Sequence, residues 1–157
     1  GVKPSPTSHF SWRNNNISVY KAFGHQHLKE IRQSMVSLQK GFKADLHFIP
    51  LRGDFPRGIL ATAYTTCPWS LEEAEKAYAD FYREAAFCFV CKENPDLKQV
   101  VNTNKCLLHL EKHGDQLLIV SVVDNLLKGA SGQAVQNMNL MFGLDEKTGL
   151  NLKSTGF

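Results

Sequence analysis

The stretch that decides the fold of this chain is Ser121-Val-Val-Asp-Asn-Leu-Leu-Lys-Gly-Ala-Ser-Gly-Gln-Ala-Val-Gln-Asn-Met-Asn-Leu-Met-Phe-Gly143. An apolar strand leads into a polar pair, then a loop of small residues, then a helix. Backbone N–H groups at a helix start attract anions, and small residues let a ligand approach closely. The loop is therefore a candidate neighbour of a phosphate or a nicotinamide, through Asn125, Lys128, Gly129 and Gly132. The same pattern also fits a tight strand-to-helix connection whose glycines serve only the backbone.

The helix that follows carries an apolar stripe at helical spacing and ends at Gly143. Such a stripe belongs to a core more often than to a cofactor site. We therefore expect its members to be core residues: Ala134, Val135, Met138, Met141 and Phe142.

Upstream of this helix the sequence predicts strands. Lys105–Glu111 and Gln116–Val123 flank Lys112-His-Gly-Asp115, a composition typical of a hairpin turn. Gln116–Val123 is almost continuously apolar, which indicates a central strand covered on both faces. Shorter alternating or β-branched runs predict further strands at residues 44–50, 58–66 and 87–91.

Two further helices are expected. Residues 27–40 place Leu28, Ile31, Met35 and Leu38 on one face, and Gly41 is a natural stop. A second helix starts where Ser70 and Glu73 form a capping box, with Trp69 before it. Residues 1–16 read as a mostly irregular lead-in, and residues 144–157 read as a tail.

This mixture of helices with hairpin-connected strands predicts an α+β fold, a mixed sheet with helices packed on it. A length of 157 residues suits one domain. The net charge of +3 is small and its basic residues are scattered, which argues against a nucleic-acid partner. No apolar run approaches the roughly 18 residues of a membrane span. Four cysteines in apolar surroundings favour reduced thiols in a cytoplasm.

The spacing of Cys88-x-x-Cys91 and Cys106-x-x-His109 is compatible with a structural zinc site. Zinc knuckles need glycine or polar turns between their ligands, whereas here the intervening residues are Phe-Val and Leu-Leu. Strand positions three apart also point to opposite faces. We therefore expect no metal here, and Cys67 reads as a core or loop thiol.

Four segments, taken in order, carry a resemblance. They are Asn16 through Tyr20 to Gly24-His-Gln-His-Leu-Lys-Glu-Ile31, Arg57-Gly-Ile-Leu-Ala-Thr62, Asn102-Thr-Asn104 and Asp124-Asn-Leu-Leu-Lys-Gly-Ala-Ser-Gly-Gln-Ala-Val-Gln136. Together they resemble the N-acetyl-gamma-glutamyl-phosphate reductases of the semialdehyde dehydrogenase family.

The resemblance implies a mixed sheet like that of the C-terminal domain of glyceraldehyde-3-phosphate dehydrogenases. It also implies that residues 1–157 are a single dimerisation and substrate domain excised from a longer chain. The Gly-rich Rossmann loop and the nucleophilic Gly-Cys-Tyr-Pro-like turn of the family are missing, so we expect NADP to bind mainly outside these residues. The fragment alone should be inactive. The implied partners are N-acyl-glutamyl 5-phosphate and further copies of the chain, as a dimer or tetramer.

Histidine is the natural proton donor for acyl-phosphate reduction because its ordinary pKa is about 6.5. The resemblance therefore implies a catalytic role for His27, with His25 in support, although two solvated histidines in a surface turn would look the same. It also implies that Arg57 binds a substrate carboxylate or phosphate, as an arginine fork can, with Asn16 and Tyr20 as further contacts. Trp12-Arg13 departs from the acidic residue expected nearby.

Two alternatives remain open from the sequence. One is a domain of an aspartate-semialdehyde dehydrogenase, which the His-x-His and Arg-Gly-Ile-Leu-Ala-Thr segments fit less well. The other is a dimerisation module with no chemistry of its own.

Overall fold

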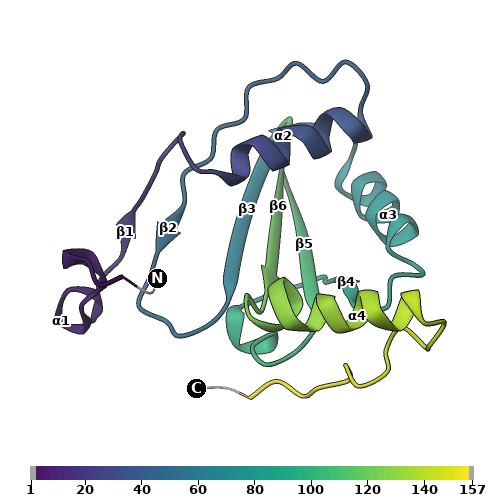
Figure 1. Ribbon diagram of the computed structural model, residues 1–157. Helices are drawn as coiled ribbons and strands as arrows, with labels where there is room; N and C mark the ends of the chain where they lie inside the picture. Colours follow the sequence, from purple (N-terminus) through teal and green to yellow (C-terminus); the bar gives the residue numbers. More distant parts are fainter. Residues whose placement is uncertain (1–2, 156–157) are drawn as a thin grey trace. The chain divides into compact units, whose positions relative to one another are not determined.

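The computed structural model describes residues 3–155. The chain forms two compact units, Gly1–Phe55 and Pro56–Phe157. The expected α+β class is confirmed, since the chain combines helices with a mixed four-stranded sheet (Figure 1). No helix between residues 3 and 155 has both the length and the apolar character needed to cross a bilayer.

The first unit is built on short elements and one longer helix, α2 (His27–Leu38), which confirms the helix expected there. The lead-in is more ordered than expected, because it contains the turn η1 (Pro6–Ser8) and the helix α1 (Phe10–Arg13). Strand β1 (Ser18–Val19) pairs antiparallel with β2 (Leu51–Arg52).

The prediction of a strand at residues 44–50 is wrong. These residues form no ladder, and the nearest strand is β2, which begins at Leu51. Two backbone bonds join this segment to the chain beyond β1: Tyr20 N donates to Pro50 O (3.1 Å) and Phe23 N donates to Phe48 O (2.9 Å). Phe23 has a left-handed φ of 57°. The segment after β1 therefore turns away from residues 44–50 and cannot continue the ladder. The alternating side chains thus lie on extended chain without a strand partner.

The second unit holds the sheet, with strands in the order β3-β6-β5-β4 (Figure 1). β3 (Ile59–Thr66) and β5 (Cys106–His113) each run antiparallel to β6 (Gln116–Val123), while β4 (Cys88–Val90) is parallel to β5. The strands expected at 58–66 and 87–91 and the hairpin are confirmed. β6 is central, as its apolar sequence predicts. β5 extends to His113, so the turn is tighter than expected.

Helix α3 (Leu71–Phe81) begins at the expected capping box. Ser70 Oγ accepts from Glu73 N (3.2 Å), and Glu73 Oε2 accepts from Ser70 N (2.7 Å). Its Ala74 is 1% exposed and packs with Leu110 and Leu117 of the sheet. This contact anchors the helix to β5 and β6.

Helix α4 (Gly132–Met141) lies where expected, but its apolar stripe is not core. Met138, Met141 and Phe142 are 45%, 81% and 74% exposed, whereas Gly132 and Asn139 are buried. Asn139 sets this orientation, because its Nδ2 donates to the carbonyl oxygens of Glu146 (3.2 Å) and Thr148 (2.9 Å).

The tail expected at 144–157 is also corrected over its described part. Leu150 is 4% exposed, and its carbonyl accepts a hydrogen bond from Asn104 Nδ2 (3.1 Å). The segment therefore belongs to the packed unit as far as this leucine.

Candidate active site

In the first unit, His25 is held at the start of α2. Its Nδ1 accepts a hydrogen bond from His27 N (3.3 Å), which places the proton of the neutral ring on Nε2. The ring lies edge-on to Tyr20, Phe48 and His27, with centroid separations of 5.6, 5.3 and 4.7 Å. The position of His25 is thus defined by aromatic neighbours and by the helix backbone, while His27 is exposed.

The charge state of His25 follows from its surroundings. Partial desolvation lowers the pKa of His25 most, and the positive charges of His27 and Lys21 lower it further, against the opposing effect of Glu30. The neutral imidazole is therefore favoured at neutral pH. A neutral ring with a fixed tautomer can orient a partner or pass a proton.

The structure brings Tyr20 to this histidine pair but leaves Asn16 apart from it. The Tyr20 ring carries the Arg52 guanidinium over its face at 4.3 Å from the centroid. Asn16 Nδ2 donates to Trp12 O (2.8 Å), so its side chain closes the end of α1. The substrate contact expected of Asn16 stays a prediction. Its hydrogen bond to Trp12 O is enough to explain why an asparagine occupies this position.

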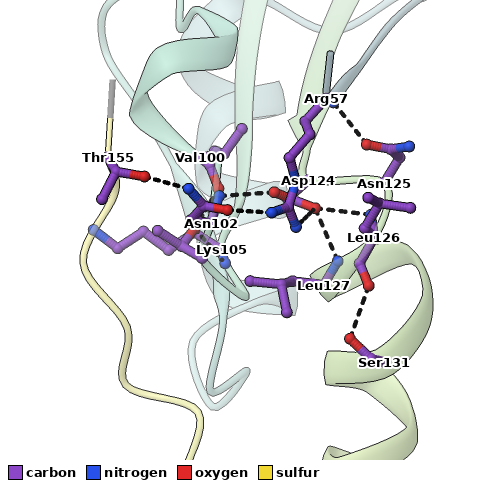
Figure 2. Close-up of polar contacts among 12 residues, drawn as sticks. Arg57, Val100, Asn102, Lys105, Asp124, Asn125, Leu126, Leu127, Ser131 and Thr155 are labelled. Carbon is purple, nitrogen blue, oxygen red and sulfur yellow. Dashed lines mark hydrogen bonds and ion pairs between the residues drawn. The ribbon is translucent and has the colours of Figure 1, made fainter. Parts of the chain in front are cut away.

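In the second unit, Asp124 at the end of β6 is the centre of a polar cluster (Figure 2). Its carboxylate is fully buried. Oδ1 accepts from the backbone N–H groups of Leu126 and Leu127 (2.8 Å each) and from Arg57 Nη2 (3.1 Å). Oδ2 accepts from Asn102 N (2.7 Å). One carboxylate thus joins the segment before β3, the loop before β5 and the turn after β6.

Burial acts to raise the pKa of Asp124. The hydrogen bonds from the amides of Leu127, Asn102 and Leu126 and from Arg57 outweigh it, so the pKa lies below the ordinary value. The carboxylate is therefore ionised at neutral pH. The N–H groups of Leu126 and Leu127 at the helix start are therefore already occupied by an anion, the carboxylate of Asp124, and are not available to a ligand.

Arg57 is largely occupied by this cluster. Nη1 donates to Asn102 Oδ1 and Nη2 to Asp124, and the side chain is 27% exposed. Asn102 has a left-handed φ of 61°, which asparagine tolerates, and its Nδ2 donates to Thr155 Oγ1. The expected substrate role of Arg57 stays a prediction. Any such contact would use the part of the guanidinium that remains exposed.

The four residues expected near a cofactor lie together in the turn after β6. Asn125 Oδ1 accepts from Gly58 N (2.7 Å), and no described residue accepts a hydrogen bond from its Nδ2. Lys128, in the single π-helical turn η3 (Leu127–Ser131), donates from Nζ to Gln136 Oε1 (3.0 Å). Asn125 therefore keeps an available amide donor, while Lys128 braces α4.

The two glycines of this turn differ in their surroundings. A Cβ added at Gly132 would lie 1.7 Å from Asn104 Oδ1 and 2.8 Å from Leu127 O. At Gly129 the nearest atom to such a Cβ is Asp124 O at 3.4 Å. Gly132 is thus required by close packing, whereas Gly129 has room for a methyl group.

No three His, Cys, Asp or Glu side chains in the described part of the chain are grouped so as to hold a metal ion. Cys88 and Cys106 face each other across β4 and β5, and His109 Nδ1 lies 3.1 Å from Cys91 O. The cysteines and the histidine whose spacing resembled a zinc site thus lie on two paired strands, β4 and β5, and at their ends.

Comparison with known proteins adds to this geometry. Residues 1–125 match the family described as "Semialdehyde dehydrogenase, dimerisation domain". The chain belongs to this family. The resemblance found in the four sequence segments is therefore confirmed.

Relatives of this semialdehyde dehydrogenase dimerisation domain carry the name "N-acetyl-gamma-glutamyl-phosphate reductase". The protein of that name from Phocaeicola vulgatus is 64% identical over all 157 residues. Those from Bacteroides fragilis and Christiangramia forsetii are 63% and 62% identical over the same residues. This chain covers 49% of each of them, so it spans about half the length of the curated relatives it matches.

The sequence did not assign the central role that Asp124 has in this dimerisation domain. Its position was a usable signal, because an aspartate between an apolar strand and a helix is a typical N-cap. Its partners Arg57 and Asn102 could not be inferred, because the hydrogen bonds join residues far apart in the chain.

Proposed function

We propose that residues 1–157 form a single substrate-binding and dimerisation domain of an NADP-dependent N-acyl-gamma-glutamyl-phosphate reductase. The reaction is reduction of an acyl phosphate to a semialdehyde, a step of arginine biosynthesis in the cytoplasm. The observation that carries the proposal is 64% identity to a reductase of that name across the whole chain. The ordered pair His25 and His27 supports it, because the reaction needs a proton donor near neutral pH.

In this proposal His27 is the acid/base group and His25 positions it. The exposed His27 ring can reach an incoming carbonyl oxygen. His25 Nδ1 accepts from the His27 backbone and its ring lies against the His27 ring, which limits how that side chain can turn. Tyr20, whose hydroxyl has no hydrogen bond within the described residues, is the best-placed candidate for a substrate contact in this unit. Arg57 and Asn16 are weaker candidates because both are engaged locally.

The turn after β6 fits one end of a nicotinamide cofactor, which would supply a hydride to the substrate carbonyl. Asn125 Nδ2 is an available donor for a carboxamide oxygen, and Asn125 is held by Gly58 N (2.7 Å). The amides of Leu126 and Leu127 are taken by Asp124, so the phosphates would bind elsewhere. We therefore propose that Asn125, with Lys128, Gly129 and Gly132 in its turn, lies beside the nicotinamide, and that other residues of the enzyme bind most of the NADP.

Self-association is the second part of the proposed function. All eight residues of β3 are exposed, and β3 is an edge of the sheet. Ile59, Leu60 and Tyr64 on this strand are 49%, 51% and 75% exposed. Apolar surface on an edge strand is normally covered by a partner, and we propose that further copies of the chain cover it, as a dimer or tetramer.

A chimera tests the catalytic part. The half of the Phocaeicola vulgatus reductase that aligns with this chain is replaced by residues 1–157. The measurement is NADPH oxidation with N-acetyl-glutamyl 5-phosphate, with phosphate released as a product. We expect turnover within roughly tenfold of the parent, because a positioned proton-transfer group is worth about 10²–10⁴ in rate and would be retained. The matched control is the same chimera with His25→Asn and His27→Asn.

A folded chimera that binds NADPH but does not turn over would contradict the assignment and favour a dimerisation module without chemistry. Preference for aspartyl phosphate would favour the aspartate-semialdehyde alternative. Residues 1–157 alone should show no turnover above background.

A further inference from the structure

Two thiols that the proposed reaction does not use lie side by side in the sheet of the second unit. Cys88 of β4 and Cys106 of β5 are directly opposite residues of a parallel pair. Neighbouring strands lie about 4.8 Å apart, and a disulfide accepts Cα separations of about 4.4–6.8 Å. β4 has only three residues and lies at the edge of the sheet, so it can adjust to a covalent bond. Both thiols are free and half-buried.

The two thiols have different surroundings. Cys106 Sγ lies 3.6 Å from Ser121 Oγ, whose hydroxyl can donate to it. A hydrogen bond from Cys88 lowers the pKa of Cys106 most, and Ser121 and the charge of Lys128 lower it further against the effect of burial. The same pairing raises the pKa of Cys88. The Cys106 thiol therefore ionises more readily than the Cys88 thiol.

The positive charge of Lys128 acts on both thiols. Its Nζ donates to Gln136 Oε1 (3.0 Å) and lies 5.7 Å from the centroid of the Phe87 ring, the residue before Cys88. A positive charge held near a thiolate is the usual setting of a reactive cysteine. The other two cysteines have different surroundings. Cys67 packs against the α3 core, and Lys112 Nζ donates to its carbonyl oxygen (2.6 Å). Burial raises the pKa of Cys91.

We propose that Cys106 and Cys88 form a peroxide-sensitive dithiol, in which Cys106 is oxidised first and Cys88 resolves it. The Cys106 thiolate attacks one oxygen of a hydroperoxide. An S–O bond forms, the O–O bond breaks, the sulfur loses two electrons to the peroxide, and protonation gives a sulfenic acid and one water or alcohol. Cys88 sulfur then attacks the Cys106 sulfur. The S–S bond forms, the S–O bond breaks, and the Cys88 proton leaves with the hydroxyl as water.

The disulfide would close the segment between Cys88 and Cys106, which carries Asn102 and its bonds to Arg57 and Asp124. A disulfide in a reducing compartment is normally transient and redox-sensing. The pair therefore gives oxidation a direct way to lock the backbone that supports the Asp124 cluster.

The test uses the purified chain and hydrogen peroxide. After treatment, free thiols are alkylated and the chain is digested and mapped by mass spectrometry. We expect a loss of two hydrogen atoms per chain, with the peptides of Cys88 and Cys106 linked and with Cys67 and Cys91 alkylated. Uniform oxidation of the four cysteines, or a link between any other two, would overturn the proposal.

Single variants separate the two roles. Cys88→Ser should leave Cys106 as a sulfenic acid that dimedone captures, and Cys106→Ser should slow thiol loss by roughly tenfold or more, because the thiolate is removed. Cys91→Ser is the matched control and should behave like the parent. An unchanged rate in Cys106→Ser would overturn the assignment. If that variant fails to fold, limited iodoacetamide labelling of the parent decides, since Cys106 must be labelled before the other three.

Discussion

Replacing Gly132 by alanine tests whether this glycine is required by packing. The added Cβ would lie 1.7 Å from Asn104 Oδ1 and 2.8 Å from both Asn104 Cγ and Leu127 O. Asn104 cannot move freely, because it is 1% exposed and its Nδ2 donates to Leu150 O (3.1 Å). The clash must therefore displace either a buried amide or the backbone of η3.

The size of the effect can be worked from these contacts. Overpacking costs about 1–3 kcal/mol, and loss of the Asn104–Leu150 hydrogen bond adds about 1 kcal/mol. Alanine is favoured over glycine in a helix by about 1 kcal/mol, which offsets part of this. We expect a net loss of about 1–3 kcal/mol in the free energy of unfolding, and a Tm lower by about 2–4 °C per kcal/mol for a chain of this size.

Urea unfolding followed by circular dichroism measures the loss. Gly129→Ala is the matched control. Its Cβ would lie 3.4 Å from Asp124 O, so stability should change by less than about 1 kcal/mol, the helix-propensity difference. In the intact enzyme this control should raise the KM for NADPH if the turn lies beside the cofactor.

A double-mutant cycle identifies the cause. In an Asn104→Ala background the methyl group of Gly132→Ala meets no amide, so the two changes should couple by about 1 kcal/mol or more. Parent-like stability of Gly132→Ala, or an equal loss in both backgrounds, would refute the packing argument.

Three further predictions follow from the polar cluster, the histidine pair and the exposed strand. Asp124→Asn should lower the free energy of unfolding at neutral pH by roughly 2–4 kcal/mol. The reason is that the Arg57 guanidinium loses its buried, negatively charged partner. Since the pKa of Asp124 lies below its ordinary value of 3.8, the contribution of this carboxylate is full above that pH and is lost as the pH falls through the folded value, so denaturation curves of parent and variant should converge in acid. In the full-length reductase, His27→Asn should lower kcat by about 10²–10⁴. His25→Asn should lower kcat by less, because it removes only the contact that orients His27. Parent-like rates for both variants would exclude the pair from the mechanism. Tyr64→Glu, on a residue 75% exposed in β3, should shift the chain toward monomer in light scattering, while Phe81→Glu, 77% exposed on α3, should leave the assembly intact; equal effects of the two would argue against β3 as the interface.

Local signals in the sequence predicted most of the elements. The capping box of Ser70 and Glu73 placed the start of α3, and the β-branched and apolar runs placed β3, β5 and β6. These predictions succeeded because hydrogen bonds within a few residues, and the burial of a regular stripe, are encoded locally. The strand expected at 44–50 failed because a strand also needs a partner, and the left-handed turn at Phe23 removed it.

What the sequence by itself determined is the family, the α+β class and the order of the elements, since the motifs and periodicities that carry them are contiguous. The local hydrogen bonds by which Asp124 fills the helix start could have been read from its position in the sequence. Only the tertiary structure decided that Arg57 and Asn102 complete its shell. Tertiary packing also turned the apolar stripe of α4 outward, because Asn139 binds the carbonyls of the following segment. The bonds from Arg57 and Asn102 to Asp124 join residues that meet only after the chain has folded, so no local pattern can specify them.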